Sequence, residues 1–144
     1  MEAKIVTYSS EHFDGVDRLW REAFPGDPPW NRADVAIRAK LAVQPDLLLV
    51  ALDGDVVVGT TMAGYDGHRG WLYTVAVRLT HRRAGMGGKL IAEAERRLAA
   101  LGCTKINLQV RSTNAEAVSF YAGLGYAAEE RVSLGKRLHP PAGA

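Results

Sequence analysis

Residues 71–91 read WLYTVAVRLTHRRAGMGGKLI, an apolar run that passes through a basic, glycine-rich turn into a helical pattern. The apolar run is rich in β-branched and aromatic residues, which predicts a strand ending near Val77. Gly85, Gly87 and Gly88 lie where the next helix begins, so the backbone there can approach a ligand closely and point its N–H groups outward. The stretch therefore predicts an anion site of the kind that holds a pyrophosphate.

Two other phosphate-binding motifs fail on spacing. A dinucleotide fingerprint needs a third glycine at position 90, which is Leu90. A Walker A loop needs glycine in place of Arg83 and a hydroxyl residue directly after Lys89. A glycine-rich turn without a ligand stays open as the alternative at this point.

Outward from this stretch, strand and helix patterns alternate along the chain. Strands are predicted at 4–8, 47–52, 56–65, 71–77 and 105–110, with one or two more within 126–138, and helices at about 10–24, 31–44, 85–101 and 115–124. Asp53-Gly54 predicts a tight hairpin between two of these strands. The predicted fold class is α/β (α+β), a mixed central sheet of six to seven strands flanked by about four helices.

Length and composition set the class of protein. The 144 residues predict one domain at 1–138 and a loose tail at 139–144. The first residues lack a secretory pattern and the chain has no apolar run of about 20 residues, so we expect a cytoplasmic protein without a membrane partner. A net charge of +2, without aromatic residues among the basic ones, predicts no nucleic-acid partner.

The single cysteine, Cys103, cannot form an internal disulfide. Its position at a helix-to-strand junction favours a buried apolar role over that of a nucleophile. No cluster of Cys and His has the spacing of metal ligands, so no metal is expected.

A second stretch, residues 114–126, reads NAEAVSFYAGLGY. Asn114 is typical of a helix cap and Gly125 of a helix end. On the helix between them, apolar spacing favours core positions for Val118, Phe120 and Leu124, and by default for Tyr121.

The two stretches together resemble motifs A and B of the GNAT superfamily of acetyltransferases, over nearly the whole predicted domain. The patterns that carry the resemblance are Arg82-x-x-Gly85-x-Gly87 and Asn114-x-x-Ala117-x-x-Phe120-Tyr121-x-x-Leu124-Gly125-Tyr126. Residues 65–70 and 133–138 further resemble the bacterial YpeA-like subgroup. The resemblance implies the GNAT (acyl-CoA N-acyltransferase) fold with a mostly antiparallel sheet, and acetyl-CoA as the acyl donor.

The resemblance also implies a set of site residues. In similar proteins the strand backbone pairs with the pantetheine arm as an added strand, and N–H groups of the following turn hold the pyrophosphate. The implied cofactor-binding residues are Val75, Ala76, Val77, Arg82, Arg83, Ala84, Gly85, Met86, Gly87, Gly88, Asn114 and Tyr121. Tyr121 would act as the general acid that protonates the departing thiolate, and the backbone N–H of Val75 would contact the oxyanion.

The implied reaction is direct attack of an uncharged amine on the thioester in a ternary complex, which requires a group that accepts a proton. In the GNAT branch that acetylates protein N-termini, a glutamate stands where this chain has Gln109, and a neutral amide cannot act as a base. Asp66, His68, Glu116 or ordered water near Tyr73 stay open as the base.

The acceptor is the least determined part. A small amine, an amino acid and a protein or peptide amine all stay open, and a homodimer is suggested by similar proteins. Four aromatic residues are candidates to line an acceptor pocket, with core packing favoured for the first two: Trp20, Phe24, Trp30 and Trp71. A non-catalytic acyl-CoA-binding or regulatory domain is the alternative function.

Overall fold

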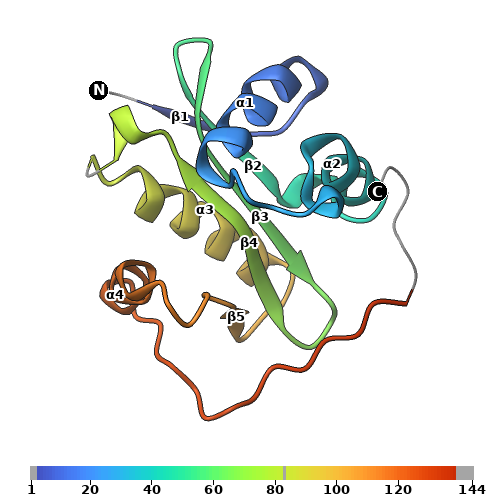
Figure 1. The fold of residues 1–144 in the computed structure, drawn as a ribbon, viewed down its shortest axis with the longest axis vertical. Coiled ribbons are helices and arrows are strands. Elements are labelled where there is room, and N and C mark those ends of the chain that lie inside the picture. Colours follow the sequence, from blue (N-terminus) through green and yellow to red (C-terminus); the bar gives the residue numbers. More distant parts are fainter. Residues whose placement is uncertain (1–2, 83, 139–144) are drawn as a thin grey trace.

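The computed structural model describes residues 3–82 and 84–138, with a five-stranded sheet in the order β1-β2-β3-β4-β5 (Figure 1). The strands are β1 (Lys4–Thr7), β2 (Leu48–Asp53), β3 (Val56–Tyr65), β4 (Gly70–Val77) and β5 (Ile106–Leu108). Strands β1 to β4 pair antiparallel with their neighbours, whereas β5 runs parallel to β4. The sheet is therefore mixed and mostly antiparallel, as predicted.

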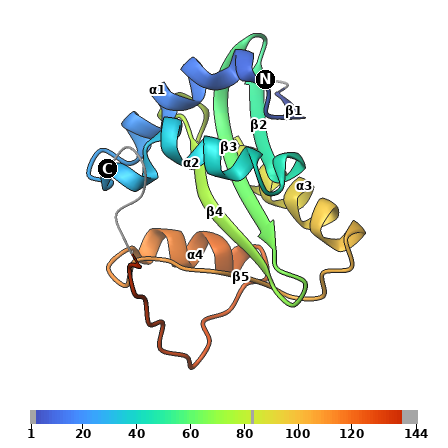
Figure 2. The ribbon, with the colours of Figure 1, turned by 90° about the vertical axis from the view of Figure 1, so that its right-hand side faces the viewer.

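The described residues form four α-helices, of which three pack on the sheet. They are α1 (Phe13–Ala23), α2 (Ala33–Leu41), α3 (Met86–Ala100) and α4 (Ala115–Gly123), with short 3-10 turns at Ser10–His12, Pro29–Asn31, Pro45–Leu47 and Leu79–His81. Figure 2 shows α1 and α2 on one face of the sheet and α3 on the other. Among the described residues, no helix combines the length and the hydrophobicity that a membrane span needs.

The core is divided by the sheet into two clusters. Buried side chains of α3, including Leu90 and Leu98, pack on one face, and those of α1 and α2, including Leu19 and Ile37, pack on the other. Trp20 belongs to the second cluster and Phe24 packs against it, which confirms the core role expected for both. The half-buried Cys103 packs against the first cluster and its Sγ donates to Lys105 O, in keeping with a structural role.

The expectation of six to seven strands is wrong at the C-terminal end. Residues 127–138 contain no strand in the structure, although their sequence has strand character. The segment contacts β5 and the residue after it through side chains, because Glu129 Oε1 accepts from Asn107 Nδ2 at 2.8 Å and Ser133 pairs with Gln109. The two segments therefore meet through side chains, and the described residues form no ladder of backbone hydrogen bonds between them.

A charged cluster anchors α3 to the start of the sheet. Glu93 accepts hydrogen bonds from Arg96 (3.0 Å) and Arg97 (2.8 Å). Arg97 also donates to Thr7 Oγ1 at 2.7 Å and to Asp46 O at 2.8 Å. The Arg96 and Arg97 hydrogen bonds lower the pKa of Glu93 from its ordinary value to about 2.

This cluster predicts a contribution to stability that disappears in acid. Because the folded-state pKa of Glu93 lies below the unfolded value, its contribution is full above about pH 4.5 and is lost as the pH falls toward about 2. We expect Glu93→Gln to lower Tm at pH 7 by about 3 °C, from a loss of about 1 kcal/mol, and to have little effect at pH 2.5. Thermal unfolding at both pH values measures this, with the exposed Glu22→Gln as the control; an equal Tm loss at both values would contradict it.

Candidate active site

The candidate site begins at an open edge of β4. Strand β5 pairs with β4 only from Gly70 to Leu72, so on that side the described chain offers no strand partner to the rest of β4. Figures 1 and 2 show β4 continuing away from β5 beyond this point. On that side, the backbone of Val75 to Val77 therefore has no strand partner among the described residues, and Val77 O accepts a hydrogen bond from Arg82 Nε at 3.0 Å.

A β-bulge lies on β4 beside this open edge. Met62 pairs with Tyr73 and Thr60 with Ala76, so β4 has one residue more than β3 across this interval. Thr74 has a φ of 46°, and within the described part of the chain it is the only non-glycine residue with positive φ. A bulge shifts the alternation of side chains, and Leu72, Val75 and Val77 accordingly all contact the core on the α3 side.

The turn after β4 leads into the start of α3. Gly85 caps the helix with a φ of 78°, a left-handed conformation that glycine adopts without strain. The N–H groups of the first helical turn, including those of Met86, Gly87 and Gly88, have no partner within the helix. Ala84 is exposed and the Met86 side chain is buried. Arg83, which was expected to bind the cofactor, lies outside the described residues.

One of the basic residues around this turn, His81, is engaged by other residues of the protein. His81, the last residue of the 3-10 turn Leu79–His81, places its Nε2 2.9 Å from Oδ2 of Asp53, the last residue of β2. Its Nδ1 lies 2.7 Å from Thr80 Oγ1. His81 therefore fastens the turn to the end of β2. Among the described residues, the exposed Lys89 and the backbone N–H groups at the start of α3 remain available to an anion.

The second motif meets the first at the start of α3. Asn114 Oδ1 accepts from Ala117 N at 3.1 Å, so Asn114 caps α4 as predicted. A Cβ built on Gly87 would lie 2.9 Å from Phe120 Cζ, which shows that α4 packs directly on this glycine. Phe120 is nevertheless 40% exposed, and Val118 and Leu124 are also exposed, so the expectation that they lie in the core is wrong. Short α4 (Ala115–Gly123) contacts the beginning of α3 at Gly87.

This contact predicts opposite effects for two adjacent glycines. Gly87→Ala would press its methyl group into Phe120, so we expect Tm to fall by about 3 °C. Gly88→Ala meets only Leu124 Cδ2, at an ordinary 3.7 Å, so the better helix propensity of alanine should raise Tm by up to about 3 °C. Thermal unfolding measures both. The double variant Gly87→Ala with Phe120→Leu should lose less than the sum of its parts, and strict additivity would contradict the packing argument.

Tyr121 lies at the junction of the two motifs. Its ring packs edge-on against Phe120 and Tyr126, with centroids 5.0 and 5.9 Å away, and it contacts the core of the α3 face. Burial raises the pKa of the Tyr121 phenol, which keeps the phenol protonated. Within the described residues, its hydroxyl has no hydrogen-bond partner, so it is free to donate to a bound group.

A neighbouring tyrosine takes a role that sequence reasoning missed. Tyr126 Oη donates to Glu95 Oε2 of α3 at 2.8 Å, and burial together with this hydrogen bond raises the pKa of Tyr126. The pair ties the end of α4 to α3 and fixes the ring against which Tyr121 packs. A glutamate 31 positions before a tyrosine gives no signal in the sequence.

The candidates for a general base are widely separated. Asp66 and His68 lie at the tip of the β3–β4 hairpin, and Val75 lies five residue steps of roughly 3.3 Å each along β4 from Gly70. Asp66 Oδ1 accepts from the backbone N–H groups of Arg69 (2.7 Å) and His68 (2.8 Å), and these bonds lower the pKa of Asp66. This carboxylate therefore organises the hairpin tip.

The other candidates lie nearer to α4 or to the bulge. Glu116 is exposed in the first turn of α4, and Gln109 follows β5 and pairs with Ser133. Tyr73 directly precedes the bulge residue and is 49% exposed. Trp71 is half-buried on β4, and Trp30 lies under Arg137, whose Cζ is 3.6 Å from the ring centroid.

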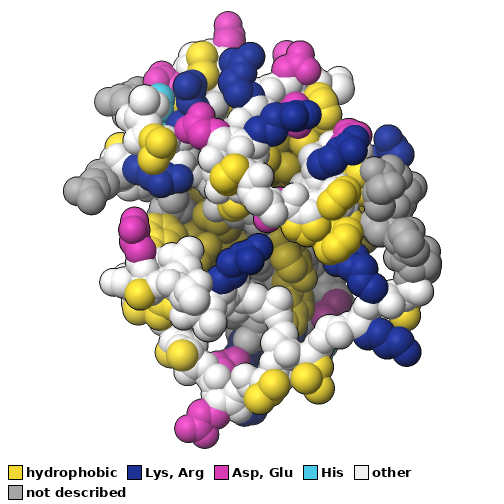
Figure 3. All heavy atoms as spheres, viewed as in Figure 1, with side chains coloured by type: hydrophobic (Ala, Val, Ile, Leu, Met, Phe, Trp, Pro, Cys, Tyr) yellow, Lys and Arg dark blue, Asp and Glu magenta, His cyan; other side chains and the backbone are white. Residues whose placement is uncertain are grey.

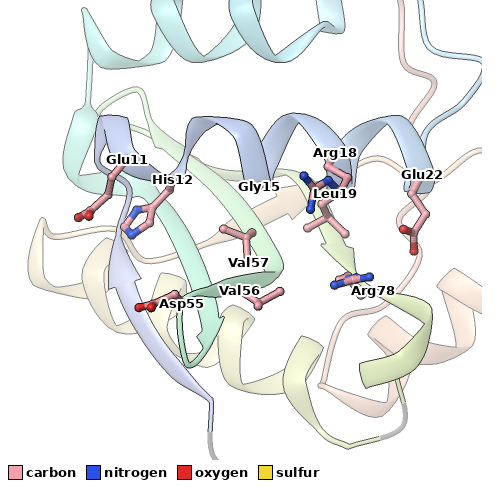
Figure 4. Close-up of a pocket in the computed structure, with 10 residues that line it drawn as sticks. All are labelled: Glu11, His12, Gly15, Arg18, Leu19, Glu22, Asp55, Val56, Val57 and Arg78. Carbon is pink, nitrogen blue, oxygen red and sulfur yellow. The ribbon is translucent and has the colours of Figure 1, made fainter.

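The surface carries a hollow and a separate cavity beside α1. Figure 3 shows a hollow in the face of Figure 1 with hydrophobic side chains at its base. A separate cavity of about 200 Å³ lies beside α1 (Figure 4). Its charged lining residues are Glu11, Glu22 and Asp55 against Arg18 and Arg78. These mixed charges make it a poor match for a pyrophosphate.

Among the described residues, no group of three or more His, Cys, Asp or Glu has the arrangement of a metal site.

Comparison with known proteins identifies the family. Residues 13–126 match the model of the acetyltransferase (GNAT) family. The chain belongs to this family. This GNAT protein is also 42% identical to an acetyltransferase of Sodalis glossinidius over 136 residues, which cover 94% of this chain and 95% of that protein.

Solved structures confirm the GNAT fold. The aminoglycoside N-acetyltransferase AAC(6')-Iy in complex with CoA aligns with a TM-score of 0.77 at 21% identity, covering 96% of each chain. The NatC complex bound to Gag peptide and CoA contains a chain that aligns with a TM-score of 0.77 at 24% identity, covering 91% of this chain and 88% of that one. At these identities the likeness establishes the fold of this GNAT protein and leaves its acceptor open.

Proposed function

We propose that this GNAT protein transfers the acetyl group of acetyl-CoA to an amine by direct attack within a ternary complex. The observation that carries the proposal is the open edge of β4, which leads through the turn into the N–H groups at the start of α3. A pantetheine arm could pair with the open edge of β4 as an added strand, and a pyrophosphate could accept from the N–H groups at the start of α3.

The proposed step uses two groups of this chain. The amine nitrogen attacks the thioester carbonyl carbon, and the N–H of Val75 donates to the oxygen that becomes negative. When the tetrahedral intermediate collapses, the carbon–sulfur bond breaks and the thiolate takes the Tyr121 proton. Burial keeps the Tyr121 phenol protonated and therefore able to donate. Because the ordinary pKa of a thiol, about 8.5, lies below that of the phenol, the transfer is uphill by itself, and the phenolate regains its proton from solvent.

For the base we favour ordered water beside Tyr73. Asp66 and His68 are separated from the bulge by several residues of β4, and the Asp66 carboxylate is engaged by two backbone N–H groups. Exposed Tyr73 adjoins Thr74 at the bulge, so a water there could pass the proton of the amine to solvent.

The test combines calorimetry of acetyl-CoA binding with a screen for release of the CoA thiol. The screen covers small amines including aminoglycosides, free amino acids, and peptides with free N-termini, because related structures contain an aminoglycoside acetyltransferase and a peptide complex. Binding followed by thiol release with one class supports the proposal and names the acceptor. Binding without release across all classes favours the alternative of a non-catalytic acyl-CoA-binding domain, and absence of binding rejects both. The homodimer, the cytoplasmic location and the YpeA-like subgroup stay predictions.

A further inference from the structure

The bulge on β4 contains a strained residue that needs support. Threonine is β-branched, and a positive φ such as the 46° of Thr74 brings its Cβ close to the backbone. Such a conformation persists only when surrounding contacts hold it. The residues that hold it therefore determine where the neighbouring peptide groups point.

A buried chain of two hydrogen bonds reaches this bulge from the α1 side. Trp20 Nε1 donates to Thr60 Oγ1 at 2.9 Å, and Thr60 Oγ1 donates to Thr74 O at 3.0 Å. Thr60 is fully buried and Trp20 is 4% exposed. Because an indole N–H can only donate, it occupies a lone pair of the Thr60 oxygen and leaves the hydroxyl proton for Thr74 O.

The carbonyl of Thr74 and the N–H of Val75 belong to one peptide group. A trans peptide is planar, so these two bonds point in opposite directions, and the described chain has no cis peptide bond. Since the Thr60 hydroxyl holds the Thr74 oxygen, the N–H of Val75 points away from that hydroxyl. The β3–β4 register gives Val75 no partner residue in β3, and β5 no longer pairs with β4 at this position, so a bound ligand can accept from this N–H.

We infer that Thr60 and Trp20 are positioning residues that aim the Val75 N–H at the carbonyl oxygen of the bound thioester. The inference rests on the proposed function, because it concerns the same donor and the same reaction. The two residues act through the Thr74–Val75 peptide group and touch neither substrate nor coenzyme. Their effect should therefore appear in the rate of the chemical step and much less in coenzyme binding.

A matched pair of variants tests this directly. Thr60→Val keeps the shape of the side chain and removes the hydroxyl, so we expect kcat to fall about tenfold while KM for acetyl-CoA changes by less than about twofold. Thr60→Ser should restore most of the rate. Thr61→Val is the control, because Thr61 is also fully buried and its Oγ1 has no hydrogen-bond partner in the described structure. A folded Thr60→Val with the kcat of the wild type would overturn the inference.

A second variant and a second readout keep the test decisive. If Thr60→Val does not fold, Trp20→Phe removes only the outer donor, and we expect it to lower kcat by about threefold. A folded Trp20→Phe with unchanged kcat would then count against the inference. In the protein without ligand, the amide NMR signals of Thr74 and Val75 should shift in Thr60→Val and stay unchanged in Thr61→Val. This readout tests the orientation of the Thr74–Val75 peptide group even if the wild type shows no acetyl transfer. Failure of the inference can therefore be distinguished from failure of the proposed function.

Discussion

Tyr121→Phe lowers kcat by about 100-fold and leaves the affinity for acetyl-CoA within about threefold of the wild type. This is the expected result because the variant removes only the hydroxyl, and general acids contribute about 100-fold or more to the steps they catalyse. The phenylalanine ring retains the packing against Phe120 and Tyr126. Steady-state kinetics and calorimetry measure the two quantities. Unchanged kcat with normal binding would mean that another group protonates the thiolate.

The control is the same change at the neighbouring tyrosine. Tyr126→Phe loses the hydrogen bond to Glu95, so we expect lower stability and a much smaller effect on kcat than Tyr121→Phe. The pH dependence gives a further check, since burial raises the pKa of Tyr121 above its ordinary value of 10.0. The acid form then persists beyond pH 10, so Tyr121 should cause no alkaline fall of kcat below that pH. A fall near pH 8 that vanished in Tyr121→Phe would contradict this assignment.

Gly85→Val weakens acetyl-CoA binding by about tenfold or more. The reason is conformational, because Gly85 has a φ of 78° and a Cβ built there meets no atom within 4 Å. Forcing a β-branched residue into the left-handed region costs about 1–2 kcal/mol, and relief of that strain would rotate the N–H groups that begin α3. Calorimetry of acetyl-CoA binding measures the effect.

Gly85→Asn separates conformation from bulk. Asparagine also adds a side chain in the same open space, yet it tolerates positive φ much better than valine does. We therefore expect its affinity for acetyl-CoA to stay within about threefold of the wild type. Equal losses for both variants would show that any side chain at this position obstructs the coenzyme, and equal retention would show that the turn does not hold it.

Local patterns were sufficient to predict much of the fold. The strand at 71–77, the glycine-rich turn and the helix after it follow from side-chain period and backbone preference, which act over a few neighbouring residues. The cap at Asn114 is local for the same reason. The extra strands within 126–138 were predicted wrongly, since strand character in a segment does not specify whether a partner backbone lies within hydrogen-bonding distance.

By itself, the sequence predicted which segments form the candidate site and which chemistry their residues would support. Only the tertiary structure decided the site's geometry: the bulge at Thr74, the packing of Phe120 on Gly87, and the pairing of Tyr126 with Glu95. The hydrogen bonds that support the bulge join residues 14 and 40 positions apart. Such contacts form only when the register of β3 against β4 and the docking of α1 are both set, because no local preference favours a left-handed threonine within a strand.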